Sequence, residues 1–353
     1  GIFKSNLKEG LPGWREAYDD LVKSRPPDWD RWNEVLHATA KHLGELLADP
    51  IVPKLIAPEI NCTRLDILPL GPLGLLPLNL AQVRATGKAL IDRFEVSLSP
   101  SLTALAHVRR RSREATRPRS IAFIRHTDGL GEDELHYTPV ETDLVTSWFE
   151  ESSRVIKDGR DTSREMVLDS LRGQDIWHFA CHGYFDLNMP LQSELRPFKE
   201  EGLTLEELFD ARGLGNPQLV VLSACSTGLY DTRELPSEFI GLPNAFLQLG
   251  AAAVIATLWP VDDVMTALLI GRFYEEYIGN GKPSCSALRA AQLWLRDLQV
   301  EELQRVIERW VSEKRLTLEN VPKVQQAIEN WTTLNPTSSA RTAYWAGFVH
   351  FGA

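Results

Sequence analysis

Four residues near the middle of the chain carry the side chains best suited to chemistry. The stretch IWHFACHGYFD (176–186) contains His178, Cys181 and His182, and Cys225 follows in LSACSTG (222–228). Imidazole and thiol groups can hold a metal ion or form a nucleophile with its base. No Cys-x-x-Cys pair occurs, and successive strand residues point to opposite sides, so Cys181 and His182 make poor joint ligands. We therefore expect no metal and no cofactor.

The elements around these residues alternate regularly between strands and helices. Apolar runs predict strands over 175–181, 219–224 and 252–258, with further strands at 120–124 and 155–156. Capping boxes at Thr138–Glu141 and Thr204–Glu207, and Thr162–Glu165, predict where three of the intervening helices begin. Continuously apolar strands separated by helices predict an α/β fold, a doubly wound, mainly parallel sheet flanked by helices.

This sheet predicts that His182 and Cys225 meet. Parallel strands present their carboxyl ends at one edge, where His182 and Gly183 end one strand and Cys225 ends the next. A nearby imidazole would lower the pKa of the Cys225 thiol from its free value of about 8.5. Strand alternation places His178 and His182 on one side and Cys181 on the other. The alternatives are a small core cysteine and a structural histidine.

Composition narrows the possible partners and location. The chain has 353 residues, 43% of them hydrophobic, and a formal net charge of −10, which argues against nucleic-acid binding. No apolar run is long enough to cross a membrane. Four scattered cysteines do not form a disulfide scaffold, so we expect a cytoplasmic protein.

Three regions are expected along the chain. Residues 1–50 have helical spacing, and residues 51–119 combine a β-rich lobe with an Arg-rich connector. The connector, Arg109 to Arg119, reads as exposed and flexible. Residues 120–353 form the α/β domain described above.

Several motifs resemble those of one protein family. IWHFACHGYFD, LVVLSACSTG, GLPNAFLQLGAAAVIATLWPVDD and YWAGFVHFG are similar to the CHAT family of caspase-like cysteine peptidases, related to caspases and separases, and ILPLGPLGLLPLNL resembles its N-terminal lobe. The resemblance covers residues 30–353. It implies that His182 and Cys225 form the catalytic dyad and that the Gly183 and Cys225 amides form the oxyanion hole. It also implies that His178 is not catalytic.

The resemblance implies a cysteine endopeptidase that cleaves a protein partner in bacterial defence or signalling. A regulatory sensor or repeat domain, in cis or in trans, is the other expected partner. By similarity to separases, Asp262 or Asp263 would bind a basic residue before the scissile bond. Either aspartate also suits a helix N-cap and its dipole. With such a preference, the connector 109–119 becomes a candidate for self-cleavage, the alternative being a plain linker.

Three other function classes can be compared with the peptidase. A catalytically silent adaptor with the same fold would keep the motifs without needing the dyad. A nucleotide-binding module needs a Gly-rich phosphate loop after its first strand, and RHTDGLGEDE does not contain one. An α/β-hydrolase needs Gly-x-Ser-x-Gly, which does not occur.

Overall fold

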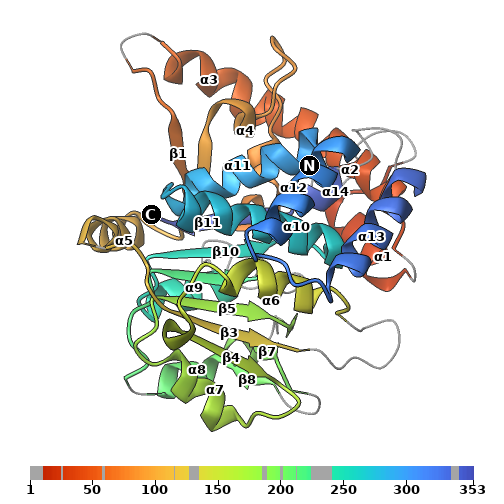
Figure 1. Cartoon of the computed structure of the whole chain (residues 1–353). Coiled ribbons are helices and arrows are strands. Elements are labelled where there is room, and N and C mark those ends of the chain that lie inside the picture. The colour runs from red at the N-terminus through yellow and green to blue at the C-terminus, as the bar shows by residue number, and fades with distance from the viewer. Residues whose placement is uncertain are drawn as a thin grey trace.

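A large central sheet organises the chain (Figure 1). The computed structural model describes residues 11–24, 27–57, 60–114, 116–126, 135–184, 189–198, 202–211, 213–223, 241–334 and 342–353. Within these residues the sheet has eight strands in the order β1-β2-β11-β10-β9-β5-β3-β4. They are β1 (Arg64–Ile67), β2 (Glu95–Leu98), β3 (Ile121–Arg125), β4 (Arg154–Asp158), β5 (Ile176–Ala180), β9 (Leu219–Leu222), β10 (Ala253–Thr257) and β11 (Phe348–Gly352).

Every neighbouring pair of these strands is parallel except β10 and β11. The predicted α/β fold with a mainly parallel sheet is therefore confirmed. Because β11 is antiparallel to β10, the strands β11, β2 and β1 run opposite to the other five. Residues of β5, β9 and β10 are all buried, as expected when helices cover both faces of a parallel sheet.

Alternate residues of β5 show which helices cover each face. His178 contacts α6 (Thr138–Thr146) and α10 (Asp263–Tyr274). Trp177 points the other way, toward Phe246 of α9 (Leu242–Gln248) and the end of α7 (Arg164–Leu171). The smaller α8 (Leu205–Asp210) begins with the predicted capping box, because Thr204 and Glu207 each accept a hydrogen bond from the other's backbone N–H.

The helices expected in the first fifty residues are present and pack on the sheet domain. They are α1 (Trp14–Lys23), α2 (Trp29–Leu43), a short π-helix (Gly44–Ala48) and α3 (Asp49–Leu55). The rings of Trp14 and Trp32 lie 6.1 and 5.6 Å from that of Trp259, in the turn between β10 and α10. This aromatic cluster anchors the N-terminal helices beside the start of α10.

Residues 51–119 contain less β-structure than expected. Of the described residues in this range, only those of β1 and β2 form strands, and both strands belong to the central sheet. The run LPLGPLGLLPLNL forms 3₁₀ turns at Gly71–Leu75 and Leu78–Leu80, because its prolines fix φ and lack the N–H that a strand ladder needs. The short α4 (Leu90–Arg93) follows. Most of the Arg-rich segment, expected as an irregular connector, continues the helix α5 (Leu102–Glu114).

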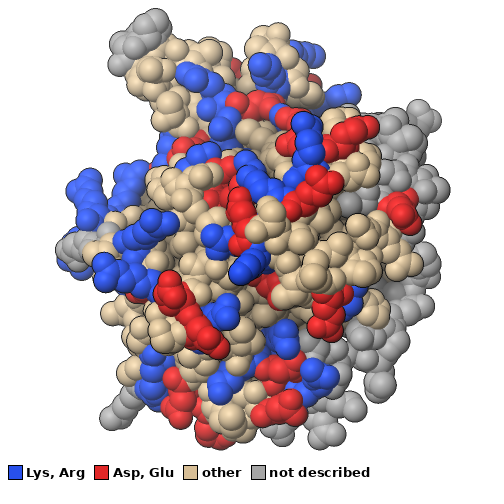
Figure 2. Space-filling view, viewed as in Figure 1, with Lys and Arg blue, Asp and Glu red and all other residues tan. Residues whose placement is uncertain are grey.

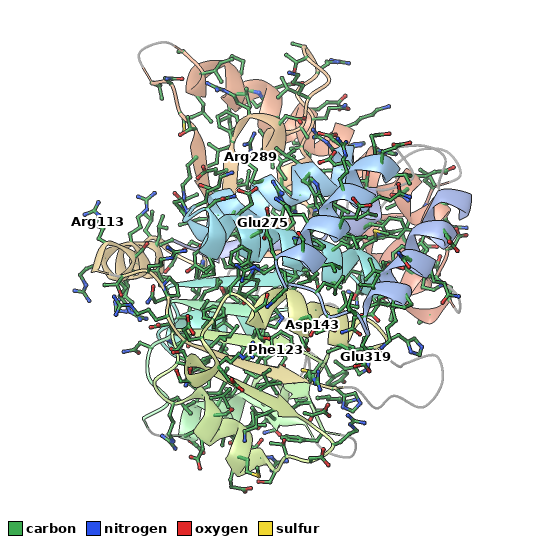
Figure 3. The ribbon with its side chains drawn as sticks, in the orientation of Figure 1. Arg113, Phe123, Asp143, Glu275, Arg289 and Glu319 are labelled. Carbon is green, nitrogen blue, oxygen red and sulfur yellow. The ribbon has the colours of Figure 1, made fainter. Side chains whose placement is uncertain are left out.

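The last part of the chain adds further helices on the side of the sheet that carries α6 and α10 (Figure 3). α11 (Ser284–Asp297) packs on α10 and directly on β2 and β11, and the short α14 (Thr342–Trp345) packs against α2, α10 and α11. α12 (Val300–Ser312) and α13 (Val321–Leu334) lie outside α6 and α10. Asp143 of α6 accepts hydrogen bonds from Thr317 N–H at 3.0 Å and from Asn320 Nδ2 at 2.8 Å. Glu275, after α10, pairs with Arg309 of α12 at 2.8 Å. These bonds fix the outer helices to the helices that cover β5.

Two helix starts differ from their predicted caps. The side chain that caps α7 is Ser163, which accepts from Met166 N–H, rather than Thr162. Thr138 lies inside α6, and Tyr137 at its N-cap position has no side-chain bond to the helix. The carboxylate of Asp263 accepts from Tyr137 N–H instead, at 2.7 Å. The side chain of Glu141, expected as the second half of a capping box, does not cap α6 and binds His178 instead.

Candidate functional site

His182 lies directly after the carboxyl end of β5, in a different strand from the one predicted. β5 ends at Ala180, and His182–Tyr184 forms β6, which pairs with β7 (Glu194–Arg196). β7 in turn pairs with β8 (Leu203–Thr204). Pairing with Arg196 therefore draws His182 out of the plane of the central sheet. His182 and Gly183 are half-buried at its edge.

The strand that leads to Cys225 is the neighbour of β5, as expected. β5 and β9 are parallel, with Phe179 opposite Leu222. Ser223 extends this ladder by one residue, because its N–H donates to the Phe179 carbonyl at 3.1 Å. Cys225 itself lies outside the described residues, two positions after Ser223. The chain therefore brings His182 and the approach to Cys225 to one edge of the sheet.

A small pocket lies at this edge. Its polar lining comes from His182 and Ser223 at the strand ends, Thr138 and Glu141 on α6, and Asp263 and Thr266 on α10. Thr266 is 3% exposed, and its hydroxyl has no hydrogen-bond partner among the described residues. Two carboxylates and an unpaired hydroxyl give the pocket acceptors for a cationic, hydrogen-bonding group.

The sequence matches the CHAT domain over residues 37–353, which is most of the chain. The chain belongs to the CHAT domain family. Its fold is similar to solved structures of caspase-like cysteine peptidases. A Saccharomyces cerevisiae separase, solved in complex with securin, has a TM-score of 0.51 and 14% identity over 81% of this chain. No curated protein sequence matches the chain.

Two further structures are of gingipains. The Porphyromonas gingivalis RgpB complex of pro- and mature domains has a TM-score of 0.51 and 10% identity, covering 95% of this chain and 70% of the other. The Arg-specific cysteine proteinase gingipain R gives the same score and identity, covering 95% and 69%. This CHAT domain spans only 15% of the separase chain. At these identities the similarity shows the fold alone.

The two candidate specificity aspartates of the CHAT domain have different surroundings. Asp262 caps α10 by accepting from Met265 N–H at 3.0 Å, and burial raises the pKa of its carboxyl. Asp263, besides accepting from Tyr137, lines the pocket with His182. Burial, and then the charges of Glu141 and Asp262, raise the pKa of Asp263 to about 7. The helix-cap interpretation thus describes Asp262, and only Asp263 lies in the pocket.

His178 is the centre of a buried network behind the pocket. It is 0% exposed and stacks on Phe123, with ring centroids 4.5 Å apart. Its Nε2 lies 2.8 Å from Glu141 Oε1 and 3.3 Å from Ser223 Oγ, and its Nδ1 lies 3.0 Å from the Tyr274 hydroxyl. A carboxylate only accepts hydrogen bonds, so Nε2–H donates to Glu141. His178 is therefore inaccessible to a substrate and instead positions Glu141.

Cys181 is a core residue. It is 1% exposed, and burial raises the pKa of its thiol far above the ordinary value, so it stays protonated. The ring of His182 packs edge-on against His126, with centroids 5.8 Å apart. His126 is held by its Nδ1, 2.8 Å from the Pro197 carbonyl. Packing against His126 limits how the His182 ring can turn.

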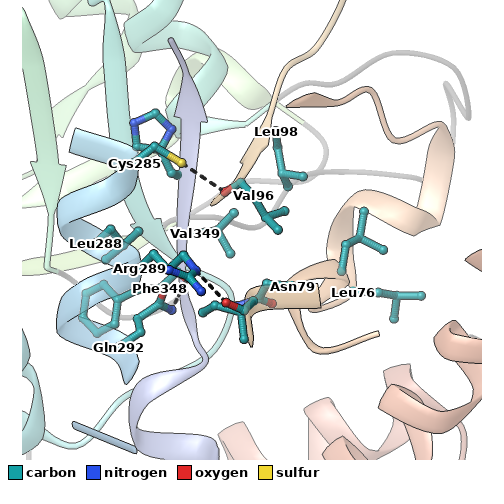
Figure 4. A pocket seen from close by; sticks show the side chains of 13 residues that line it. Leu76, Asn79, Val96, Leu98, Cys285, Leu288, Arg289, Gln292, Phe348 and Val349 are labelled. Carbon is teal, nitrogen blue, oxygen red and sulfur yellow. Dashed lines mark hydrogen bonds between the residues drawn. The ribbon is translucent and has the colours of Figure 1, made fainter. Parts of the chain in front are cut away.

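A second pocket, between α11, β2 and β11, resembles a site in composition only (Figure 4). The thiol of Cys285 points to the Val96 carbonyl, and burial raises its pKa to about 12. His350 lies 2.8 Å from both Ser97 Oγ and Ser284 Oγ, and burial lowers its pKa to about 3. A thiol that stays protonated and a histidine too weak to take up a proton make this a structural cluster.

Sequence reasoning missed three residues of the site: Glu141, Thr266 and Tyr274. Glu141 carried a signal, but its position three residues after Thr138 matched a capping box. Thr266 follows Asp263 by three residues, slightly less than one helical turn, which places both on one side of α10. Among the described residues, no three His, Cys, Asp or Glu side chains gather to hold a metal, and no helix is long and apolar enough to cross a membrane.

Proposed function

We propose that the chain is a cysteine endopeptidase that uses Cys225 as nucleophile and His182 as its base. The observation that carries the proposal is the arrangement of β5 and β9, which are parallel neighbours. His182 follows the end of one strand and Cys225 follows the end of the other. The alternative thiols at Cys181 and Cys285 are buried with raised pKa values, so neither competes as a nucleophile.

In this mechanism His182 accepts the proton of the Cys225 thiol, and the thiolate attacks the carbonyl carbon of the scissile peptide bond. A C–S bond forms and the carbonyl oxygen becomes an oxyanion, which the backbone N–H groups of Gly183 and Cys225 would stabilise. His182 then protonates the departing amine as the C–N bond breaks. Water, deprotonated by His182, hydrolyses the thioester and regenerates the thiol.

The pocket beside His182 supports a basic residue before the scissile bond. The carboxylate of Asp263 can accept two guanidinium N–H groups, and the unpaired Thr266 hydroxyl can accept another. Glu141 adds negative charge while remaining tied to His178. Arginine suits this set better than lysine because its donors are planar and spread over a fork. Asp262, occupied as a helix cap, takes no part in this proposal.

The proposed substrate is a protein, cleaved in the cytoplasm in a bacterial defence or signalling response. A sensor or repeat domain, in cis or in trans, would control access to the site. The separase of similar fold was solved bound to a protein partner, securin. That precedent supports regulation by a bound protein. A regulator with a basic residue could bind the acidic pocket and block it.

The test is cleavage of a peptide library that varies the residue before the scissile bond, with products sequenced by mass spectrometry. The purified chain should cut after arginine, and the Cys225→Ala chain should not cut at all. Absence of cleavage by both, even with proteins encoded beside this one added as activators, would favour the catalytically silent adaptor.

A further inference from the structure

The Arg-rich stretch is not explained by the proposed peptidase. Residues 109–119 contain six arginines in a chain whose net charge is −10. Their first part lies in α5, which packs on the sheet through Leu105 and Val108. The opposite side of α5 is exposed along its whole length. Figure 2 shows basic side chains gathered over this helix, whereas acidic and basic residues are mixed over the rest of the same face.

Two of the arginines fasten the helix, and two do not. Arg109 pairs with Asp66, and Arg111 donates to the Asn216 carbonyl at 2.9 Å. Arg110 Nη2 lies 3.4 Å from His107 Nδ1, and among the side chains that the structure describes, which stop at Arg113 in this helix, neither Arg110 nor Arg113 is paired with a carboxylate. Arg113 lies at the outer side of α5 (Figure 3). These two guanidinium groups are available to a partner.

The helix lies at the edge of the sheet opposite the candidate active site. α5 connects the carboxyl end of β2 to the amino end of β3, and Asn216 lies just before the amino end of β9. His182 follows the carboxyl end of β5, so the length of these strands, about 15 Å, separates the two sites (Figure 1). The segment is thus badly placed to enter the pocket of its own chain, and its helical part would have to unfold to be cut.

The exposed side of α5 carries both apolar and charged side chains. Leu102, Ala106 and Arg113 lie within one stripe of the exposed side, with Arg110 next to it. Leu102 is 73% exposed. The stripe therefore offers an apolar contact at one end and guanidinium groups at the other.

We infer that this stripe of α5 is a docking surface for an acidic segment of a partner protein. Guanidinium groups bind carboxylates with paired, charge-assisted hydrogen bonds. Leu102 and Ala106 add apolar contact that a phosphate backbone would not use. An acidic protein segment with an apolar residue matches the whole stripe.

The test uses the full chain and a fluorescein-labelled synthetic peptide rich in glutamate and containing one leucine. Fluorescence anisotropy should show salt-sensitive binding that weakens about tenfold in the Arg110→Gln/Arg113→Gln double variant and less in Leu102→Ala. The control is Arg15→Gln/Arg305→Gln, which removes the same charge from exposed positions on α1 and α12. It should bind like the unmodified chain.

Three results would overturn the inference. They are no binding of the peptide, an equal loss in both double variants, and tighter binding of a single-stranded oligonucleotide of the same charge. Circular dichroism melts of each variant separate a lost surface from a lost fold. Because none of these readouts uses peptidase activity, the outcome is independent of the proposed catalytic function.

Discussion

The carboxylate of Asp263 accepts a hydrogen bond from the backbone N–H of Tyr137 at 2.7 Å, and so one helix caps another across the pocket. Asp263 begins α10, and Tyr137 precedes α6. The same carboxyl lines the pocket beside His182. The side chain of Asp263 thus both caps α6 and lines the proposed specificity pocket. A substitution of Asp263 can test the second role if the first is kept.

Asp263→Asn should lower kcat/KM for peptides with arginine before the scissile bond by about 10- to 100-fold, because it removes a charge-assisted bond worth roughly 1.5–3 kcal/mol. The amide can still accept from Tyr137 N–H, so the cap survives. Asp262→Asn is the matched control, since asparagine also caps helices and this residue lies outside the polar lining of the pocket. Equal effects of the two substitutions on kcat/KM would remove Asp263 from the specificity assignment.

The preference for arginine should depend on pH. Burial raises the pKa of Asp263 to about 7, so below that pH the carboxyl is protonated and uncharged, and above it the carboxyl attracts a guanidinium. The ratio of kcat/KM for arginine over leucine peptides should therefore rise between about pH 6 and pH 8.

Glu141→Gln should move that transition to lower pH. The charge of Glu141 helps to raise the pKa of Asp263, and glutamine removes the charge while its oxygen still accepts from His178. The measurement is the same ratio of kcat/KM over the same pH range. A transition at unchanged pH would show that Glu141 and Asp263 do not interact in the bound state.

His178 should contribute to stability and not to chemistry. His178→Ala leaves the Glu141 carboxylate buried without its donor, which should lower the free energy of unfolding by about 3–5 kcal/mol. Tyr274→Phe removes a single hydrogen bond at the other ring nitrogen and should cost about 1 kcal/mol. Urea denaturation measures both, and folded His178→Ala protein should keep most of its peptidase activity.

A double-mutant cycle provides the check on that explanation. Glu141→Gln combined with His178→Ala should cost less than the sum of the two single substitutions, because the neutral amide is cheaper to bury than a lone carboxylate. Additive costs would mean that the 2.8 Å contact carries little energy.

The features that could be predicted from the sequence are those set locally. Continuous apolar runs indicated β5, β9 and β10 and their parallel order, and Asp262 has the spacing of an N-cap that it fulfils. These patterns depend on neighbours within a few residues, or on burial of a whole strand.

The features that escaped prediction depend on contacts distant in the sequence. The cap on α6 comes from Asp263, 126 residues away from Tyr137, so the local capping box at Thr138 was wrong. The Arg-rich segment was predicted as a linker because its charged residues are typical of an exposed connector. Leu105 and Val108, the two buried residues that hold α5 on the sheet, precede that segment. His182 lies outside the central sheet because its strand, β6, pairs with β7, where Arg196 is its partner.

Alanine substitutions should separate the dyad from its neighbours. Cys225→Ala and His182→Ala should each abolish peptidase activity, because nucleophile and base act as a unit. Cys181→Ala should keep most of it, since that thiol is buried and protonated. Product formation from an arginine peptide is the readout, and activity that survives in Cys225→Ala would sink the assignment of the nucleophile.

The most direct measurement of the central claim is the rate of iodoacetamide modification of each cysteine as a function of pH, followed by mass spectrometry. In the unmodified chain Cys225 should react faster than Cys62, Cys181 and Cys285, with an apparent pKa below the free value of about 8.5. His182→Ala should slow Cys225 and return its pKa toward that value. Equally slow labelling of all four cysteines, or a Cys225 profile that His182→Ala leaves unchanged, would contradict the proposed dyad.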